Sequence, residues 1–264
     1  MTPIRLGAVG YLNARPLVYG LDRSRRFSLR SDLPSQCAEL LHRGEIDVGL
    51  IPSIEYLRGR EPYFIVPGPV VASRGPVASV AIYTRRDLKD LRSIAMDTSS
   101  RTSVALATVL ARREFGIAPS LIDAPPDLRA MLDLADAALI IGDRALLLDH
   151  AASGVRKIDL GEIWTNTTGL PFVYAFWAGR ARVLTPDDVK ALRRARDEGV
   201  VRPGEIARSY FPDAPGLQTV AEKYLRDNIK YDLGADEHEG LVTFYRYAAE
   251  LGLASCDGPL RFYA

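Results

Sequence analysis

Apolar runs alternate with stretches of helical spacing along the first 50 residues. Residues 4–9 predict a strand that ends at Gly10, and residues 27–30 predict a second, weaker strand. Residues 34–43 carry apolar side chains at helical spacing and begin with a proline, which suits a first helical turn. Residues 46–51 predict a buried strand. This strand–helix–strand order is typical of a parallel sheet with helices on its faces.

The same pattern returns in the middle of the chain. It predicts, in order, strands and helices at residues 93–96, 102–115, 121–122, 126–134 and 137–141. The two buried strands of the first half start 42 residues apart, at Ile4 and Ile46, and those of the second half start 43 apart, at Ile94 and Ala137. We interpret this agreement as an internal architectural repeat.

Two longer apolar segments bracket the second repeat. Residues 77–83 predict a strand that leads into it, and residues 171–178 predict a strand that leads out. The remaining chain predicts four helices, at residues 186–196 with Thr185 as N-cap, and at 203–210, 217–228 and 237–251.

The simplest arrangement of these elements is an α/β fold of two lobes joined by two crossing strands, with a cleft between the lobes. Lobe one comprises residues 1–83 and 179–264, and lobe two comprises residues 84–178. We expect the chain to bend near residues 83–84 and 178–179 when the lobes close.

The carboxyl ends of the strands should face this cleft, because ligands of open α/β sheets bind there. Residues 99–103 place four hydroxyl residues and one arginine where a helix begins; they are Ser99, Ser100, Arg101, Thr102 and Ser103. A helix N-terminus has free N–H groups and the positive end of the dipole, so it accepts an anion. Plain N-capping is the alternative, but one cap needs one hydroxyl. We favour carboxylate binding.

Other polar residues at the strand ends are compatible with two roles each. Asn13 follows the first strand and either caps a helix or hydrogen-bonds a ligand. Ser53, which follows the strand at residues 46–51, has the same two possible roles. Ser79 lies on the first crossing strand. Arg15 is expected to be solvated beside Pro16.

Glu55 and Asp143 are the carboxylates nearest the strand ends. Either could serve as a base if burial raised its pKa. The alternative is that each caps a helix or pairs with an arginine such as Arg144.

The composition restricts the class of protein. Hydrophobic residues make up 47% of the 264 residues, and 34 Lys and Arg face 33 Asp and Glu, giving a net charge of +1. This is typical of a globular protein and argues against a nucleic-acid or membrane-surface partner. Two cysteines, Cys37 and Cys256, fit a reducing compartment. The N-terminus shows no export signal, and no apolar run could span a bilayer, so a cytoplasmic location is expected.

Motifs for several enzyme classes are missing. The histidines His42, His150 and His238 are scattered, and none lies at a strand end. No metal-ligand spacing, glycine-rich phosphate loop or serine-hydrolase elbow occurs, so no metal or nucleotide cofactor is predicted. An aromatic group near the second crossing strand is compatible with either core or a cleft wall; it comprises Trp164, Phe172, Tyr174 and Trp177.

Six sequence blocks, taken in order, resemble a known family. They are residues 10–17 (Gly-Tyr-Leu-Asn-Ala-Arg-Pro-Leu), 44–53, 75–80, 97–103, 141–146 and 169–173. The chain resembles the chorismate dehydratases of the futalosine route to menaquinone. The resemblance covers nearly the whole chain.

The resemblance implies a type II periplasmic-binding-protein-like fold, in agreement with the two lobes. It implies conversion of chorismate to 3-[(1-carboxyvinyl)oxy]benzoate and water, without a metal or organic cofactor. The asparagine of the Tyr-Leu-Asn signature, here Asn13, is the residue linked to catalysis. We expect substrate contacts from the polar residues at the strand ends, namely Ser53, Ser79, Ser99, Ser100, Thr102, Ser103 and Asp143.

Chorismate carries two carboxylates, and few carboxylates or histidines lie at the strand ends. We therefore hypothesise that Asn13 orients the substrate and that the substrate's own side-chain carboxylate takes the proton.

Two other functions are compatible with the same fold. A sister family makes 1,4-dihydroxy-6-naphthoate, but it opens with a Cys-Pro-Asn-Asp-type signature and uses a histidine, whereas position 13 here lies in Tyr-Leu-Asn. A non-catalytic small-carboxylate binding protein is the second alternative, because the fold alone does not decide function.

Overall fold

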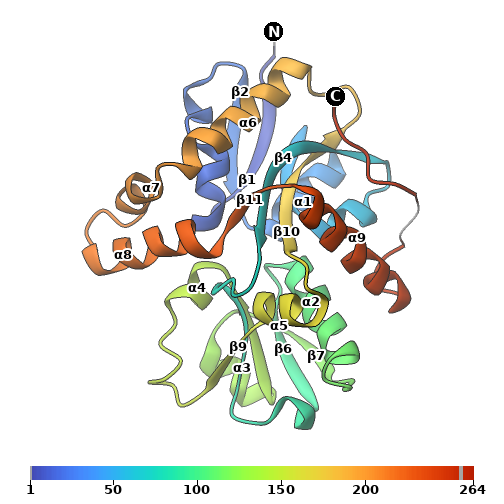
Figure 1. The fold of residues 1–264 in the computed structure, drawn as a ribbon, viewed down its shortest axis with the longest axis vertical. Helices are drawn as coiled ribbons and strands as arrows, with labels where there is room; N and C mark the ends of the chain where they lie inside the picture. Colours follow the sequence, from blue (N-terminus) through green and yellow to red (C-terminus); the bar gives the residue numbers. More distant parts are fainter. Residues whose placement is uncertain (1, 256–257) are drawn as a thin grey trace.

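The computed structural model describes residues 2–255 and 258–264. Cys256, one of the two cysteines considered above, lies outside these residues. Cys37 is a buried free thiol. The described chain forms two sheets, one above the other in Figure 1, with helices packed around each.

The first sheet has six strands. Their order is β2 (Phe27–Asp32), β1 (Ile4–Val9), β3 (Val48–Pro52), β10 (Phe172–Arg180), β4 (Tyr63–Ser73) and β11 (Lys230–Asp232), with β11 at the opposite edge from β2. Strand β1 pairs in parallel with β2 and β3. Strand β10 runs antiparallel to β3 and β4.

The second sheet has five strands and repeats this plan. Their order is β7 (Ser120–Ala124), β6 (Ser93–Asp97), β8 (Ala137–Ile141), β5 (Val80–Thr84) and β9 (Arg156–Asp159). Strand β6 pairs in parallel with β7 and β8, and β5 runs antiparallel to β8. In each sheet the first strand of the repeat, β1 or β6, therefore lies between two parallel partners. An antiparallel strand follows, β10 beside β3 and β5 beside β8. The predicted repeat is confirmed.

The helices cover both sheets. The α-helices are α1 (Pro34–Arg43), α2 (Arg101–Arg113), α3 (Leu128–Leu134), α4 (Gly142–Leu147), α5 (Leu160–Thr168), α6 (Pro186–Val200), α7 (Pro203–Tyr210), α8 (Pro215–Lys223) and α9 (Ala235–Glu250). Four 3-10 segments, η1 (Leu12–Val18), η2 (Leu21–Arg23), η3 (Ser53–Arg58) and η4 (Leu88–Asp90), and one π-helix, η5 (Tyr224–Asn228), join them. Thr185 caps α6 as predicted, because its Oγ1 accepts a hydrogen bond from Asp188 N at 3.3 Å.

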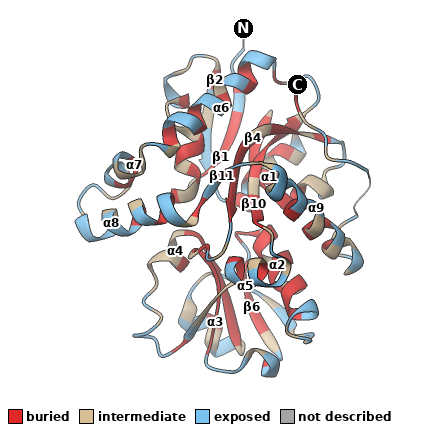
Figure 2. Ribbon diagram, in the orientation of Figure 1, coloured by how far each residue is buried: buried red, intermediate tan, exposed pale blue. Residues whose placement is uncertain are grey.

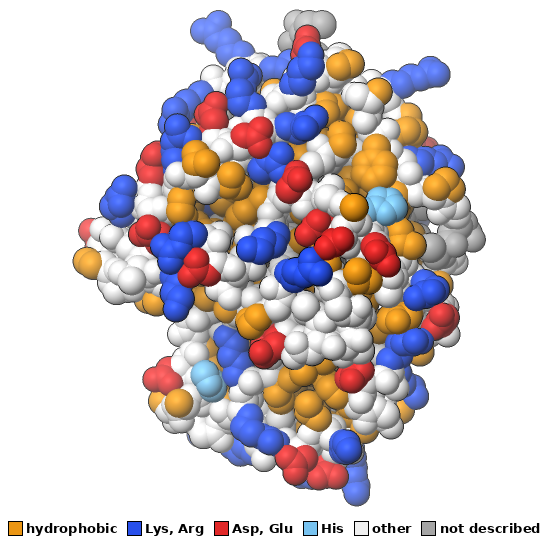
Figure 3. All heavy atoms as spheres, in the orientation of Figure 1, with side chains coloured by type: hydrophobic (Ala, Val, Ile, Leu, Met, Phe, Trp, Pro, Cys, Tyr) orange, Lys and Arg blue, Asp and Glu red, His pale blue; other side chains and the backbone are white. Residues whose placement is uncertain are grey.

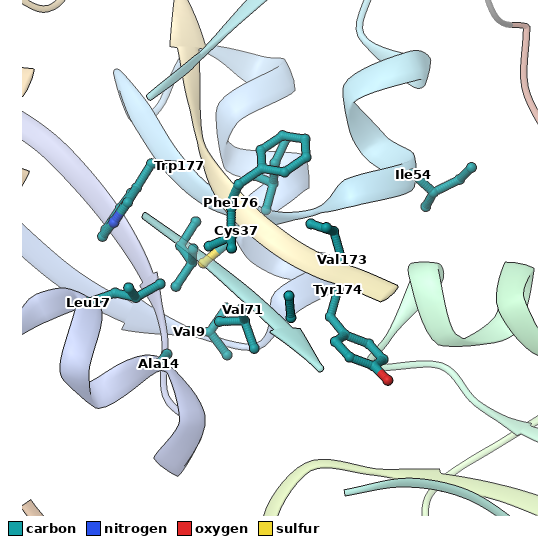
Figure 4. Packing of buried hydrophobic residues seen from close by; sticks show 14 of the residues in the cluster. Val9, Ala14, Leu17, Cys37, Ile54, Val71, Val173, Tyr174, Phe176 and Trp177 are labelled. Carbon is teal, nitrogen blue, oxygen red and sulfur yellow. The ribbon is translucent and has the colours of Figure 1, made fainter. Parts of the chain in front are cut away.

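The core lies on both faces of each sheet. Figure 2 shows the strands of both lobes buried and the outer faces of the helices exposed. The aromatic group belongs mainly to this core, since Trp164, Phe172 and Trp177 are at most 1% exposed. Figure 4 shows that Tyr174 differs, because its hydroxyl turns away from the packed aliphatic side chains.

Two predicted elements differ from the structure, and one strand was not predicted. The strand predicted at residues 77–83 begins only at Val80, because Ala78 takes a left-handed conformation with φ of 64°, which breaks an extended strand. The helix predicted at 217–228 divides into α8 and η5. Strand β4 was not predicted, because Pro67, Gly68 and Pro69 in its interior argue against a strand.

The chain crosses twice between the sheets, as expected, but at different residues. Strand β5 lies wholly in the second sheet and β10 wholly in the first, so the crossings are residues 74–79 and 169–171. Residues 83–84 and 178–179 are paired within their sheets. A hinge there would break ladder hydrogen bonds, so the expected hinge positions are wrong.

Helix α6 packs closely on η1 through Gly199. A Cβ at this position would lie 2.2 Å from the carbonyl oxygen of Pro16, which is backbone and has little freedom to move. We expect Gly199→Ala to lower the free energy of unfolding by about 2 kcal/mol, measured by urea denaturation. Gly216→Ala on α8 is the control, because nothing lies within 4 Å of its added Cβ. Equal stability of the two variants would contradict the close packing.

Candidate active site

A pocket lies between the two sheets, where the carboxyl ends of the parallel strands face one another. Its walls include Val9 and Leu50 from the first sheet and Ile141 from the second. Its polar lining consists of Tyr11, Asn13, Ser79, Ser100, Ser103 and Tyr174. No Lys, Arg, Asp or Glu of the described chain lines this pocket. A ligand here therefore meets neutral hydroxyl and amide groups.

Asn13 lies in η1, directly after β1, and lines the pocket from the first lobe. Its Nδ2–H donates to the hydroxyl of Tyr224 at 3.2 Å. That hydroxyl also lies 2.7 Å from Ser79 Oγ in the first crossing segment. The predicted residues Asn13 and Ser79 are thus brought together through a tyrosine that the sequence analysis did not single out.

The start of α2 faces Asn13 from the second lobe. Ser100 is the N-cap, and its Oγ accepts a hydrogen bond from Ser103 N at 3.4 Å and lies 2.9 Å from Ser103 Oγ. Both side chains line the pocket at the positive end of a 13-residue helix. This is the predicted position for an anion, and the structure also satisfies the capping alternative.

Ser99 is adjacent to the pocket but is already paired. Its Oγ donates to Asp97 Oδ1 at 2.6 Å, and it accepts a hydrogen bond from the Tyr11 hydroxyl at 3.1 Å. The Tyr11 contact crosses from one lobe to the other. Ser99 therefore orients Tyr11, which lines the pocket.

Ser53 and Thr102 lie together behind the pocket and do not line it. Thr102 Oγ1 accepts a hydrogen bond from Ile54 N at 3.2 Å, and Ser53 Oγ donates to the carbonyl of Val173 at 2.8 Å. The Ile54–Thr102 bond joins η3 to α2 across the two lobes, and Ser53 Oγ lies 3.4 Å from Thr102 Oγ1 at the same contact. The Ser53–Val173 bond joins η3 to β10 within lobe one. The geometry assigns both hydroxyls to the contact between the lobes.

Asp143 also joins the lobes and does not line the pocket. Its carboxylate accepts hydrogen bonds from Leu12 N at 3.1 Å and from the Tyr210 hydroxyl at 2.5 Å. Burial raises the pKa of Asp143, and these two hydrogen bonds oppose the increase. The carboxylate holds η1, and hence Asn13, against α4.

Arg15 of η1 packs against Tyr210, the tyrosine that donates to Asp143. Its guanidinium lies over the ring of Tyr210, 5.1 Å from the centroid, and its Nε is buried without a hydrogen-bond partner among the described residues. Arg15 is therefore half-buried and only partly solvated, because Tyr210 and the carbonyl of Gly10 contact its guanidinium.

Glu55 is the centre of a network of one histidine and two arginines, with 1% of its side chain exposed. Its carboxylate lies 3.0 Å from His42 Nε2, 2.9 Å from Arg58 Nη1 and 2.8 Å from Arg101 Nη1. Burial alone would raise the pKa of Glu55, but the hydrogen bond from His42 and the two guanidinium charges lower it to about 2. Because Glu55 is ionised, paired and absent from the pocket lining, it is not placed to act as the base.

Among the described residues, Tyr11 and Tyr174 are the only titratable side chains that line the pocket. Burial raises the pKa of Tyr11, and it raises that of Tyr174 well above its ordinary value. Both phenols are therefore protonated at neutral pH and cannot accept a proton there. The pocket of the described chain offers hydrogen bonds but no base.

Sequence reasoning missed two tyrosines of the site, Tyr11 and Tyr224, and left the role of a third, Tyr174, open. Tyr11 had a signal, because it stands beside Asn13 at the end of β1. Tyr174 was weighed as core or cleft wall, and it lines the pocket. Tyr224 had no local signal, since it lies 211 residues from Asn13.

Two further features concern metals and membranes. Within residues 2–255 and 258–264, no group of three or more His, Cys, Asp or Glu side chains could hold a metal ion. No helix in the same residues is both long and apolar enough to span a bilayer. On the face shown in Figure 3, acidic and basic side chains are interspersed, in keeping with the net charge of +1.

The two sheets, the double crossing and the pocket between them define a two-lobed protein with a periplasmic-binding-protein-like fold. A family model described as menaquinone biosynthesis matches residues 4–250. The chain belongs to this menaquinone biosynthesis family.

Relatives in sequence carry a more specific name. A chorismate dehydratase of Thermus thermophilus is 33% identical over 269 residues, covering 96% of this chain and 97% of the relative. A chorismate dehydratase of Campylobacter jejuni is 27% identical, covering 92% and 93%. The resemblance stated from the sequence blocks is confirmed.

Solved structures support the fold. Protein AF1704 from Archaeoglobus fulgidus matches with a TM-score of 0.78 at 17% identity, covering 96% of this chain and 98% of that one. The periplasmic aliphatic sulphonate binding protein SsuA from Escherichia coli matches with a TM-score of 0.62, also at 17% identity, covering 100% and 94%. At these identities the likeness concerns the fold alone.

Proposed function

We propose that this protein is a chorismate dehydratase that converts chorismate to 3-[(1-carboxyvinyl)oxy]benzoate and water, a hydro-lyase reaction in menaquinone biosynthesis. The family and the two named relatives support the substrate. The observation that carries the proposal is the pocket itself, in which Asn13 of the Tyr-Leu-Asn signature faces the start of α2 and no charged side chain of the described residues intervenes.

The lining suits a twice-negative substrate of modest size. One carboxylate is held at the start of α2, where Ser100, Ser103 and the helix dipole offer hydrogen bonds and a positive potential. Asn13 and Ser79 on the opposite side orient the other polar groups of the substrate. Apolar walls such as Val9 and Leu50 pack against the ring.

The elimination needs a proton acceptor that the pocket lining does not supply. The side-chain carboxylate of chorismate takes the proton from C3, the C3–H electron pair becomes the C3=C4 double bond, and the C4 hydroxyl leaves with that proton as water. The ring becomes aromatic, which drives the reaction. The protein contributes orientation and the exclusion of water. No metal or organic cofactor takes part in this scheme.

Incubation of the purified protein with chorismate tests the proposal. We expect the ultraviolet absorbance of chorismate to disappear and a product one water lighter to appear in the mass spectrum, faster than in a protein-free control. Tight binding without turnover would instead support a small-carboxylate binding protein. If neither binding nor turnover occurred, the proposed substrate would be wrong.

A further inference from the structure

Tyr224 links two pocket residues from behind the wall. Its side chain is 3% exposed and comes from the π-helix η5, far in sequence from both partners. Its hydroxyl accepts a hydrogen bond from Asn13 Nδ2 at 3.2 Å and lies 2.7 Å from Ser79 Oγ. Tyr224 itself does not line the pocket, whereas Asn13 and Ser79 do.

The direction of these hydrogen bonds follows from counting hydrogens. Burial raises the pKa of Tyr224, so the phenol keeps its single hydrogen at neutral pH. Because the Asn13 amide already donates to this oxygen, the phenol hydrogen needs an acceptor, and Ser79 Oγ is the acceptor within reach among the described residues. Ser79 thus accepts from Tyr224, and its own hydrogen remains available.

We propose that Tyr224 is a positioning residue that fixes the Asn13 amide and makes the Ser79 hydroxyl a hydrogen-bond donor toward an oxygen of the substrate. The inference rests on the proposed function for the identity of that substrate. The proposal fixes the direction of the hydrogen bond between Ser79 and the substrate. A Ser79 hydroxyl that donated to Tyr224 could only accept a hydrogen bond from the ligand.

Hydrogen bonds also hold the backbone directly before Ser79. Ala78 is held in its left-handed conformation because its N–H donates to Asp159 Oδ2 at 2.6 Å and its carbonyl accepts from Lys157 Nζ at 2.6 Å. A non-glycine residue in this region is strained and persists only where its surroundings hold it. The strain is thus located directly before the hydroxyl that we assign as a donor.

The π-helix holds the same crossing segment at a second point. Asn228, four residues after Tyr224, donates from Nδ2 to the carbonyl of Pro76 at 2.8 Å. A π turn is uncommon and frequently occurs at functional sites. Here η5 turns both Tyr224 and Asn228 toward residues 76–79.

Replacement of the phenol hydroxyl tests the inference. We expect Tyr224→Phe to lower kcat for chorismate about tenfold, as for the loss of one oriented hydrogen bond. Tyr231→Phe is the matched control, because the hydroxyl of Tyr231 is buried without a hydrogen-bond partner among the described residues, and kcat should not change. The Tm of both variants is measured in parallel.

A double-mutant cycle separates positioning from general support of the fold. Because Tyr224 acts through both the Ser79 hydrogen and the Asn13 amide, Tyr224→Phe should slow the Ser79→Ala variant by a smaller factor than it slows the wild type. Effects on kcat that multiply would overturn the inference, as would a Tyr224→Phe variant with the kcat of the Tyr231→Phe control.

Failure of the proposed function gives a different result. If the wild-type protein leaves chorismate intact but binds it, the cycle is repeated on the Kd for chorismate measured by calorimetry. The inference then requires that each single variant weakens binding and that the double variant weakens it by less than the product of the two single effects. If wild-type protein neither binds nor converts chorismate, both the inference and the proposed function are wrong.

Discussion

Asn13→Ala is expected to lower kcat/KM for chorismate by on the order of 10²–10³-fold, the loss seen when one preorganised hydrogen-bond donor is removed from an active site. The reason is geometric. Asn13 is held from one side by Tyr224 and lies in η1, whose first turn is fixed by the contact of Asp143 with Leu12 N. The side chain is therefore preorganised, and alanine leaves the pocket without a polar group at that point. Steady-state kinetics measure the effect.

The control for this prediction is Asn166→Ala, since Asn166 is exposed on α5 and does not line the pocket. We expect the control to keep wild-type kinetics and Asn13→Ala to keep the wild-type Tm. If Asn13→Ala retained full activity while Asp143→Asn abolished it with binding intact, the orientation role of Asn13 would be wrong and a protein carboxylate would be the base.

Glu55→Gln is expected to lower the free energy of unfolding by about 3 kcal/mol at pH 7. The pKa of Glu55 in the folded protein is about 2, below its ordinary value of 4.5, so the ionised carboxylate stabilises the folded state. Because the folded pKa is depressed, this contribution is complete above pH 4.5 and is lost as the pH falls toward 2. Glutamine has the same shape as the protonated acid, so wild type and variant should converge at low pH.

Denaturant unfolding of both proteins between pH 7 and pH 3 checks this prediction. Glu39→Gln is the matched control, because Glu39 also pairs with Arg101, at 2.6 Å, but is 45% exposed. An exposed pair contributes at most about 1 kcal/mol. If the stability difference of Glu55→Gln did not depend on pH, the carboxylate would not be ionised in the folded protein.

The position of Glu55 in the sequence explains why it was considered as a base. From the sequence, Glu55 follows a buried strand and resembles a carboxylate at the edge of a cleft. Its three partners, one histidine and two arginines, come from α1, η3 and α2, and the arginine of α2 lies 46 residues away. No local pattern shows which of many arginines will reach a given carboxylate.

Ser53 and Thr102 were also expected in the pocket, and their side chains point elsewhere. Both follow a strand and lie beside residues that line the pocket. The Ser53 hydroxyl instead donates to Val173 O, and the Thr102 hydroxyl accepts from Ile54 N. On a helical turn, a shift of one residue rotates the side chain by about 100°, so neighbours such as Thr102 and Ser103 face different surroundings. Position along the chain predicted the edge of the sheet but not the direction of each side chain.

By itself, the sequence determined the repeated strand–helix–strand order, the bounds of α1 and α7, the cap at Thr185 and the placement of Asn13 and Ser100 at strand ends. These follow from periodicity and capping, which act over a few residues. Only the tertiary structure decided that Tyr224 joins Asn13 to Ser79, that the chain crosses at residues 74–79, and that no carboxylate of the described chain lines the pocket. Those outcomes depend on the packing of segments distant in sequence, in which burial and hydrogen-bond satisfaction select among many possible partners.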